Sequence, residues 1–350
     1  MSLINKIYKY LADKYKIRAI YKIIRNDDND FNKILEAYIR QKNPVLLVEN
    51  NEGHSNEIVY NIEIGVDEKD ICGFFAIVAH TLDYLRFAET LGLKANIVWG
   101  ENTRYYDAAR GSNVFLYYFN QINEDIDKTQ TKIIKSKNVD LHYTFKAVKS
   151  ERQGYIVEDV GIDNFAYYYR KYFSLNEQTK TIIDEKIKSI FDGKSNILGV
   201  HVRGTDFKWN LNDHPKFQGF SVYVDAVKKL MDDKKYDYVF LATDDQEALR
   251  LFQEEFGDKL IYYSECHRAS GNIGVHCGSS DKYEIGLDIL KDVYTLVRCD
   301  GLICGISQVS IAVRYIKRSL DEEYRDLRII KSDINKGTIT ESEKNKKLKV

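Results

Sequence analysis

Two side chains suited to chemistry close an apolar run in the middle of the chain. Residues 196–206 read N-I-L-G-V-H-V-R-G-T-D, and the apolar start of this stretch predicts a buried strand. His201 and Arg203 alternate with Val202, so on an extended backbone both side chains leave the same face at the strand's end. Arginine suits phosphate binding because its planar guanidinium stays charged and makes paired hydrogen bonds. The alternative is a structural arginine that binds no ligand.

Two later strand ends are polar in the same way. Thr243 and Asp244 follow one apolar run, while Ser307 and Gln308 follow another and open a predicted helix. A helix N-terminus exposes unpaired backbone N–H groups and the positive end of the helix dipole, which together attract anions. Each segment alone is also an ordinary helix cap. Three polar strand ends on one edge of a parallel sheet, one of them with an arginine, predict a phosphorylated ligand.

Other signatures of phosphate and metal binding are missing or weak. Neither G-x-x-x-x-G-K-[ST] nor a G-x-G-x-x-G after a strand occurs. Asp-x-Asp pairs can hold a divalent ion on a nucleotide diphosphate, but an aspartate-rich chain contains such pairs by chance. Cys266-His267 and His276-Cys277 bracket a loop, yet zinc ligands are usually spaced by two or more residues. We expect no metal cofactor. The Asp-x-Asp pairs are Asp28/Asp30 and Asp125/Asp127.

The chain reads as alternating strands and helices, which predicts an α/β protein with parallel sheets. In the first half, strand patterns occupy 58–64, 95–99 and 114–119, and a helical pattern runs from 76 to 90. Gly73, just before this helix, indicates either a close approach of a ligand to the backbone or tight packing. The second half alternates strands at 197–202, 238–242, 260–263 and 301–304 with helices at 177–191, 222–231, 246–256, 284–298 and from 308 onward.

Composition is that of an ordinary globular protein, with 350 residues of which 44% are apolar and 30% charged. The net charge of −1 argues against a general nucleic-acid binder. The length fits two domains or one large one. Five cysteines without a disulfide-scaffold spacing, and the lack of a signal peptide or a bilayer-long apolar stretch, predict a reduced cytoplasmic protein.

Residues 1–26 form a basic amphipathic pattern. Apolar residues recur at helical spacing, and seven lysines and arginines are opposed by Asp13 alone. Such a helix can lie on an anionic membrane surface. The alternative is a helix docked on its own protein, with its lysines facing solvent.

Three motifs in the second half occur in a fixed order. They are His201-Val-Arg203-Gly-Thr-Asp206, then Phe240-Leu-Ala-Thr-Asp-Asp245, then Leu287-Asp-Ile-Leu-Lys-Asp292 continuing through Cys299-Asp300 to Ser307-Gln308-Val309. In this order and spacing they resemble the GDP-fucose-dependent fucosyltransferases. These include the α1,6-fucosyltransferases of glycan cores, the rhizobial chitin-oligosaccharide fucosyltransferases and the protein O-fucosyltransferases. The resemblance covers about residues 196–315 and, in the first half, is limited to the Gly73 loop and its helix.

The resemblance implies a role for each motif residue. Arg203 would grip the β-phosphate of GDP-fucose, and His201 and Asp292 would contact the nucleoside. Ser307 and Gln308 would meet the phosphates. The reaction would need no metal, since Arg203 and the helix N-terminus would neutralise the charge that grows on departing GDP. The implied donor-binding set is His201, Arg203, Gly73, Thr243, Asp244, Asp292, Ser307 and Gln308.

The chain departs from these relatives at two places. Some relatives carry a second arginine where this chain has Gly204. Where the glycan-core enzymes place a catalytic glutamate, shortly before a His-Pro pair, this chain has Asn210 ahead of His214-Pro215. Asp206 and Asp213 are the nearby carboxylates that could act as general base on an acceptor hydroxyl. A strongly dissociative reaction with little demand for a base is the alternative.

The patterns and the resemblance together imply an inverting, metal-independent glycosyltransferase with two Rossmann-like domains facing a cleft, the GT-B arrangement. Residues 27–175 would form the acceptor domain, 176–335 the nucleotide-sugar domain and 336–350 a flexible tail. The enzyme would move a sugar, L-fucose first, from a GDP-sugar to a hydroxyl of a bacterial surface glycan or glycolipid precursor in polysaccharide biosynthesis. Its location would be cytoplasmic, with membrane contact through residues 1–26. The alternatives are another GDP-sugar, such as GDP-heptose or GDP-mannose, another phosphorylated donor, or a nucleotide-sugar-binding protein without catalysis.

Overall fold

The structure is a computed structural model that describes residues 58–70, 72–90, 92–123, 132–136, 152–153, 156–157, 159–233, 235–269 and 281–338. The chain divides into two compact units. The larger comprises Ile64–Leu82, Ile97–Ile122 and Ser150–Val350, and the smaller comprises Met1–Glu63, Asp83–Asn96 and Asn123–Lys149. The predictions for segment 1–26, for both Asp-x-Asp pairs, for His276-Cys277 and for most of the tail 336–350 fall outside the described residues.

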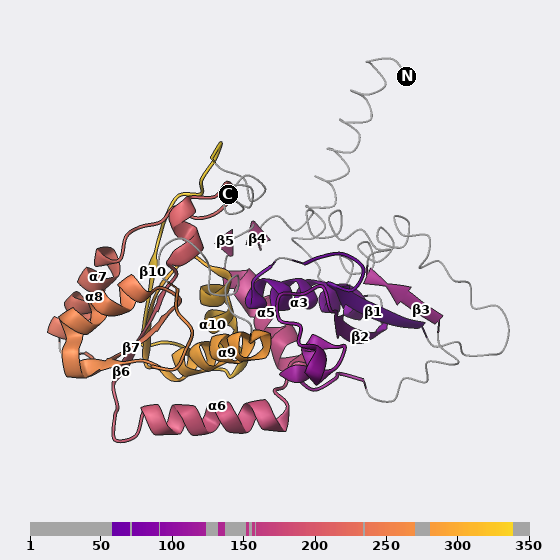
Figure 1. The fold of residues 1–350 in the computed structure, drawn as a ribbon, viewed down its shortest axis with the longest axis horizontal. Helices are drawn as coiled ribbons and strands as arrows, with labels where there is room; N and C mark the ends of the chain where they lie inside the picture. Colours follow the sequence, from indigo (N-terminus) through magenta and orange to yellow (C-terminus); the bar gives the residue numbers. More distant parts are fainter. Residues whose placement is uncertain are drawn as a thin grey trace, which may run out of the picture. The chain divides into compact units, whose positions relative to one another are not determined.

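A parallel five-stranded sheet organises the larger unit (Figure 1). Its strands are β6 (Ile197–Val202), β7 (Tyr238–Thr243), β8 (Leu260–Ile261), β9 (Gly301–Gly305) and β10 (Asp326–Ile330), in the order β10-β9-β6-β7-β8. The four strands predicted in this half are confirmed. β10 was not predicted from the sequence, because it mixes charged and apolar residues. The strand order reverses between β6 and β9, and ligands of such sheets bind outside the carboxyl ends of the strands at this point.

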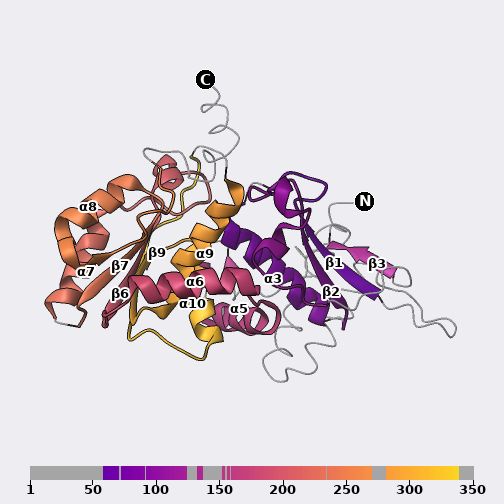
Figure 2. The same cartoon turned by 60° about the horizontal axis from the view of Figure 1, so that its bottom comes forward.

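Helices cover both faces of this sheet (Figure 2). Two of them, α7 (Ser221–Asp232) and α8 (Gln246–Phe256), lie on one face, and α9 (Lys282–Arg298) and α10 (Gln308–Ser319) lie on the other. Outside these, α6 (Glu177–Ile190) packs against α9, and α5 (Asp159–Tyr172) packs against α10. The five helices predicted in this half are confirmed. None of the described helices is both long and apolar enough to span a bilayer.

The central strands are apolar because both of their faces are covered. All six residues of β6 and five of the six in β7 are buried. Continuous apolar runs are expected of parallel strands with helices on both sides. Each large apolar side chain buried here contributes roughly 1.5–3 kcal/mol by leaving water. The core shared with α7 and α8 includes Leu198, Val200, Val202, Tyr223, Val227, Val239, Leu241 and Phe252.

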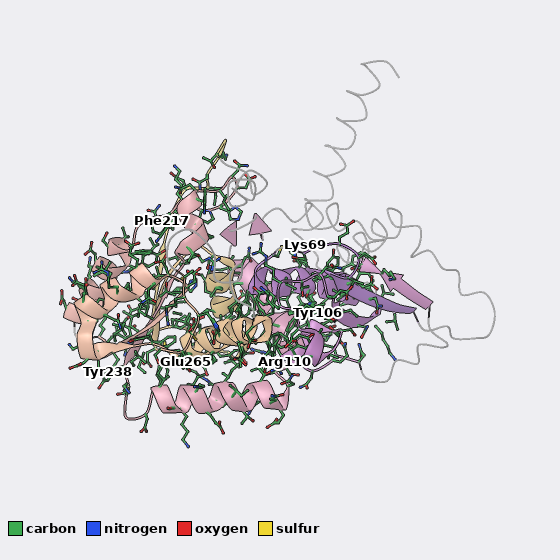
Figure 3. All side chains as sticks on the ribbon, viewed as in Figure 1. Lys69, Tyr106, Arg110, Phe217, Tyr238 and Glu265 are labelled. Atoms are coloured by element: carbon green, nitrogen blue, oxygen red, sulfur yellow. The ribbon has the colours of Figure 1, made fainter. Side chains whose placement is uncertain are left out.

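Residues 97–122 belong to the larger unit and pack on α9. The ring of Tyr118 stacks on that of Tyr283, with centroids 5.4 Å apart and an interplanar angle of 6°. The Tyr118 hydroxyl donates to the Tyr283 carbonyl oxygen at 3.0 Å. Arg110, labelled in Figure 3, ends the 3₁₀ helix η2 (Ala108–Arg110), and its guanidinium carbon lies 3.3 Å from the Tyr283 ring centroid. Tyr118 and Arg110 therefore both contact the ring of Tyr283 at the start of α9.

A three-stranded sheet lies in the first half of the chain, in the order β2 (Lys94–Trp99), β1 (Ile58–Ile64), β3 (Lys132–Lys135). β1 and β3 are parallel. The helix α3 (Phe74–Thr90) follows β1 in the chain. Within the smaller unit, the ring of Tyr60 packs against those of Tyr84 and Phe87. The strands predicted at 58–64 and 95–99 and the helix from 76 are thus confirmed, and the helix begins two residues earlier.

The strand predicted at 114–119 is wrong. Val114–Tyr117 form a 3₁₀ helix, η3. Asn113 caps it: the side-chain Oδ1 accepts from Phe115 N at 3.2 Å and from Trp99 N at 3.0 Å, and Nδ2 donates to a β2 carbonyl oxygen at 2.9 Å. The side chain of Asn113 thus makes the hydrogen bonds to β2 that the backbone of a neighbouring strand would otherwise make. Such bonds from a side chain to the backbone favour a turn over a strand. The segment resembled a strand because its apolar side chains are buried all the same.

Gly305 closes β9 at a place with no room for a side chain. A Cβ atom there would lie 2.1 Å from Tyr223 Oη and 3.3 Å from Tyr223 Cζ. We expect Gly305→Ala to lower the free energy of unfolding by about 1–3 kcal/mol, the usual cost of overpacking, in urea denaturation. In a Tyr223→Phe background the same substitution should cost much less, because the hydroxyl is the main obstacle. Equal costs in the two backgrounds would contradict this account.

Candidate functional site

His201 lies at the point where the strand order reverses. It pairs in register with β7 on one side and with β9 on the other. Its Nδ1 lies 3.0 Å from Ser310 Oγ, which in turn lies 3.0 Å from the Oγ of Ser307, the N-cap of α10. Burial, assisted by the charge of Arg203, lowers the pKa of His201 to about 3. The imidazole is therefore neutral at physiological pH and links the end of β6 to the start of α10 by hydrogen bonding.

Arg203 is held in place by Asp244. The guanidinium Nη1 pairs with Asp244 Oδ2. The same carboxylate accepts a hydrogen bond from Thr205 Oγ1 at 2.6 Å and another from Gly204 N at 2.9 Å. Both charged side chains are largely buried, with 23% and 14% of their surface exposed. A guanidinium carries five N–H donors in a rigid plane, so the bond to Asp244 sets the direction in which the whole group points.

The loop that carries Arg203 is strained and is held by the next aspartate. Thr205 has a φ of +26°, a conformation that β-branched residues rarely adopt. Its N–H donates to Asp245 Oδ2 at 3.0 Å, and the fully buried Asp245 also caps α8 and pairs with Lys208 Nζ at 2.9 Å. A Cβ atom at Gly204 would lie 2.4 Å from Asp245 Cβ. This explains why the position holds glycine.

A pocket of about 70 Å³ opens beside Arg203. It is formed by the carboxyl ends of β6 and β7, the segment after β8 and one face of α9. The structure brings together five of the predicted donor-binding residues in its lining, namely His201, Arg203, Thr243, Asp244 and Asp292. The other polar side chains of the lining are Cys266, His267 and Asp288.

Asp292 brings an unsatisfied carboxylate oxygen to this pocket. Among the described residues, its buried Oδ1 has no hydrogen-bond partner. Burial raises the pKa of Asp292 to about 7, against the lowering effect of Arg268. Gln308, the first residue of α10, likewise has a buried Oε1 with no partner in the described part of the chain. A buried polar atom left unpaired costs about 1–3 kcal/mol, so both atoms indicate places where a ligand would supply hydrogen bonds.

A second imidazole lines the pocket through a contact that the sequence did not reveal. His267 Nδ1 lies 2.7 Å from Asp288 Oδ2, which also accepts the His267 N–H at 3.0 Å. Burial raises the pKa of Asp288, but the bonds from Lys291, at 2.8 Å, and from His267 outweigh it and lower the pKa. Glu265, labelled in Figure 3, lies 3.7 Å from Lys291 Nζ. His267 and Asp288 are 21 residues apart and on different elements, so no periodic pattern in the sequence connects them.

The remaining predicted residues lie outside the pocket lining. Ser307 caps α10 and accepts the Ser310 N–H at 3.0 Å. Gly73 is exposed before α3, and a Cβ atom there would meet no described atom within 4 Å, so tight packing does not explain this glycine. Asp213 is exposed in a turn, where its carboxylate accepts from Asn212 Nδ2 at 2.8 Å. The backbone of Asp206 belongs to η5 (Thr205–Trp209), and its side chain lies outside the described part. The catalytic roles of Asp206 and Asp213 stay predictions.

The chain is similar to solved structures of fucosyltransferases, the class that its three motifs predicted. Fucosyltransferase NodZ from Bradyrhizobium is 18% identical, with 74% of this chain and 92% of that chain covered and a TM-score of 0.44. NodZ alpha-1,6-fucosyltransferase soaked with GDP-fucose is 18% identical over 74% and 91%, with a TM-score of 0.45. POFUT1 in complex with GDP-fucose is 12% identical over 82% and 100%, with a TM-score of 0.42. No family model and no curated protein matches the chain.

The anchoring of the loop by Asp245 can be tested by its effect on stability. We expect Asp245→Ala to lower the free energy of unfolding by about 3–5 kcal/mol, since it leaves buried N–H groups unpaired and removes the buried one of the two carboxylates that pair with Lys208. Glu247→Ala is the matched control, because Glu247 also pairs with Lys208, at 3.0 Å, but is 63% exposed. That control should change stability by less than about 1 kcal/mol. Similar losses for both variants in urea denaturation would show that Asp245 has no special role.

Proposed function

We propose that this chain is a glycosyltransferase that moves a sugar from GDP to an acceptor hydroxyl, with inversion at the anomeric carbon. The observation that carries the proposal is the composition of the pocket at the strand-order reversal. Arg203 reaches it from the end of β6 as an oriented cation, and Asp292 reaches it from α9 with an unpaired carboxylate oxygen. A nucleoside diphosphate has the complementary pattern, with anionic phosphates at one end and base N–H donors at the other.

The phosphate end of this pattern consists of Arg203 and the start of α10. The first turn of a helix contributes unpaired N–H groups and roughly half a positive charge, and Ser307 and Gln308 stand there. His201 stays neutral between the two, so it adds a hydrogen-bonding group rather than charge. When the bond from the sugar to the diphosphate breaks, negative charge grows on departing GDP. A guanidinium already oriented by Asp244 can stabilise that charge without reorganising.

The base end favours guanine over the other common bases. Guanine presents a ring N–H and an amino group side by side, and both can donate to the two oxygens of one carboxylate. Uracil and adenine lack this adjacent pair. Asp292 is the carboxylate of the lining that has a buried oxygen without a partner in the described chain, whereas Asp244 and Asp288 are already paired with cations. We therefore assign guanine recognition to Asp292.

The finer parts of the proposal concern the sugar, the acceptor and the setting of the enzyme. We propose GDP-fucose, the compound present in two of the similar structures, as the donor, and a bacterial surface glycan or glycolipid precursor as the acceptor. Residues 27–175 would form the acceptor domain of a GT-B arrangement. We also propose a cytoplasmic location, with contact to the membrane through residues 1–26. The acceptor, the role of residues 27–175 and the location rest on the sequence patterns, and no metal takes part in the proposed transfer.

A nucleotide-sugar-binding protein without turnover is the second candidate. It is favoured by Asn210, which stands where the glycan-core enzymes carry their glutamate and whose Oδ1 accepts the Phe217 N–H at 3.2 Å. Asp213, one alternative base, does not line the pocket. Incubation with GDP-fucose and a panel of glycan acceptors separates the two candidates. Release of GDP with formation of a fucosylated product supports the enzyme, and tight binding without release supports the binding protein.

The role of Arg203 predicts a loss of GDP affinity on its removal. By isothermal titration calorimetry with EDTA present, Arg203→Ala should bind GDP more weakly by about 1.5–3 kcal/mol, the range for a hydrogen bond to a charged group. Arg250→Ala is the control, because this exposed arginine of α8 pairs with Glu254 on its own helix. It should bind GDP as the wild type does. A wild type that binds no GDP would overturn the proposed function, and equal binding by Arg203→Ala would overturn the role of Arg203.

The role of Asp292 predicts that GDP binding depends on pH. The free carboxyl has a pKa of about 7, and guanine donors bind its ionised form. Bound GDP therefore lowers this pKa, so affinity is full above pH 8 and falls by up to about tenfold per pH unit as the pH drops below 7. Asp292→Asn should bind more weakly at pH 8 and lose this part of the slope. The terminal phosphate of GDP titrates with the wild type and with Asp292→Asn alike. The difference between the two slopes of GDP affinity against pH therefore reports the contribution of Asp292. Parallel slopes would contradict the assignment.

A further inference from the structure

A cluster of metal-ligating side chains lies just before and within α3. Among the described residues, Asp70, Cys72 and His80 each offer one ligand atom, and these three atoms lie within 4.8 Å of one another. All three residues are partly buried, and none of them lines the pocket beside Arg203. The proposed transfer reaction makes no use of them.

We propose that Asp70, Cys72 and His80 bind a zinc ion. Thiolate sulfur, imidazole nitrogen and carboxylate oxygen are the three kinds of ligand that zinc takes in proteins. In a tetrahedral site with the usual bond lengths, such atoms lie about 3.3–3.6 Å apart. Small side-chain adjustments therefore convert the observed cluster into a site. The thiolate excludes Mg²⁺ and Ca²⁺, which prefer oxygen ligands alone.

The backbone around the cluster already holds the ligands in position. Asp70 N donates to Asn102 O at 3.1 Å, and Asp70 Oδ1 accepts the Cys72 N–H at 2.7 Å. The Gly73 carbonyl oxygen accepts the first N–H bonds of α3, from Ala76 at 2.9 Å and Ile77 at 3.1 Å. Two ligands thus come from a loop fixed by hydrogen bonds, and the third comes from the helix that the loop enters. Metal sites need ligands supported in this way.

The ion would fasten the loop that contains Gly73 onto α3. Zinc with one thiolate, one carboxylate and one neutral imidazole carries no net charge, and binding releases the thiol proton. Three protein ligands leave one coordination position for water. Tyr105 also fixes the start of α3 next to the cluster, since its hydroxyl accepts the Phe74 N–H at 2.7 Å.

The test is a Co²⁺ titration of the full-length protein after removal of metal with a chelator. Wild type should take up one Co²⁺ per chain with thiolate-to-cobalt charge-transfer absorption, and Zn²⁺ should displace it. Cys72→Ser should abolish this absorption. His80→Gln and Asp70→Asn should weaken binding by more than the roughly 10- to 100-fold that the loss of an outer-shell partner costs. Circular dichroism checks that each variant is folded. If Cys72→Ser does not fold, the test rests on His80→Gln.

Two controls separate this site from accidental binding. Glu68→Gln changes an exposed acid of the same loop and should leave the titration unaltered. Cys266→Ser and Cys277→Ser remove the thiols of the two Cys/His pairs elsewhere in the chain and should also have no effect. The proposal is wrong if wild type shows no thiolate-to-cobalt absorption. It is equally wrong if that absorption persists in Cys72→Ser and depends on Cys266 or Cys277.

Discussion

Two consecutive carboxylates after β7 control the geometry of the site. Successive side chains of an extended chain point to opposite sides. Asp244 therefore meets Arg203 at the pocket, while Asp245 is buried under the loop and caps α8. Between them they bond Arg203, Gly204 N, both donors of Thr205 and Lys208. Fixing a long cationic side chain costs about 1.5–2 kcal/mol of rotamer entropy. Here that cost is met during folding, before any ligand binds.

The environment of α9 gives two of its carboxylates opposite properties. Asp288 and Asp292 are one helical turn apart, and burial raises the pKa of each. The bonds from Lys291 and His267 outweigh burial at Asp288 and lower its pKa, whereas Arg268 only partly offsets burial at Asp292, whose pKa stays near 7. Asp288 is thus bonded to His267, whereas Asp292 has a buried oxygen with no hydrogen-bond partner among the described residues. Differently perturbed carboxylates in one pocket are typical of functional sites.

The sequence predicted those features that depend on neighbouring residues. The apolar runs of β6, β7 and β9 were found because strands covered on both faces contain little else, and the polar segments that follow β7 and β9 marked the starts of the next helices. Contacts between distant segments were beyond such patterns. The order of the strands, the pairing of His267 with Asp288 and the clash that requires Gly204 all depend on the folded chain. The strand predicted at 114–119 failed because the side chain of Asn113 replaces backbone pairing, which no hydrophobic period records.

The lack of room at Gly204 limits the positive charge that the loop after β6 can bring to the proposed site. Because Asp245 fills the space beside it, the loop after β6 presents Arg203 and no second arginine. The positive end of α10 is a second source of positive potential, and it reaches only a few ångströms beyond the first turn. A protonated His201 would add charge between the two, but burial holds its pKa near 3 and Arg203 disfavours its protonation further. Among the described residues that line the pocket, Arg203 is the one arginine or lysine, and Asp244 fixes its direction. In the proposed transfer, a cation that is already fixed would stabilise the departing diphosphate without losing interaction energy to reorganisation.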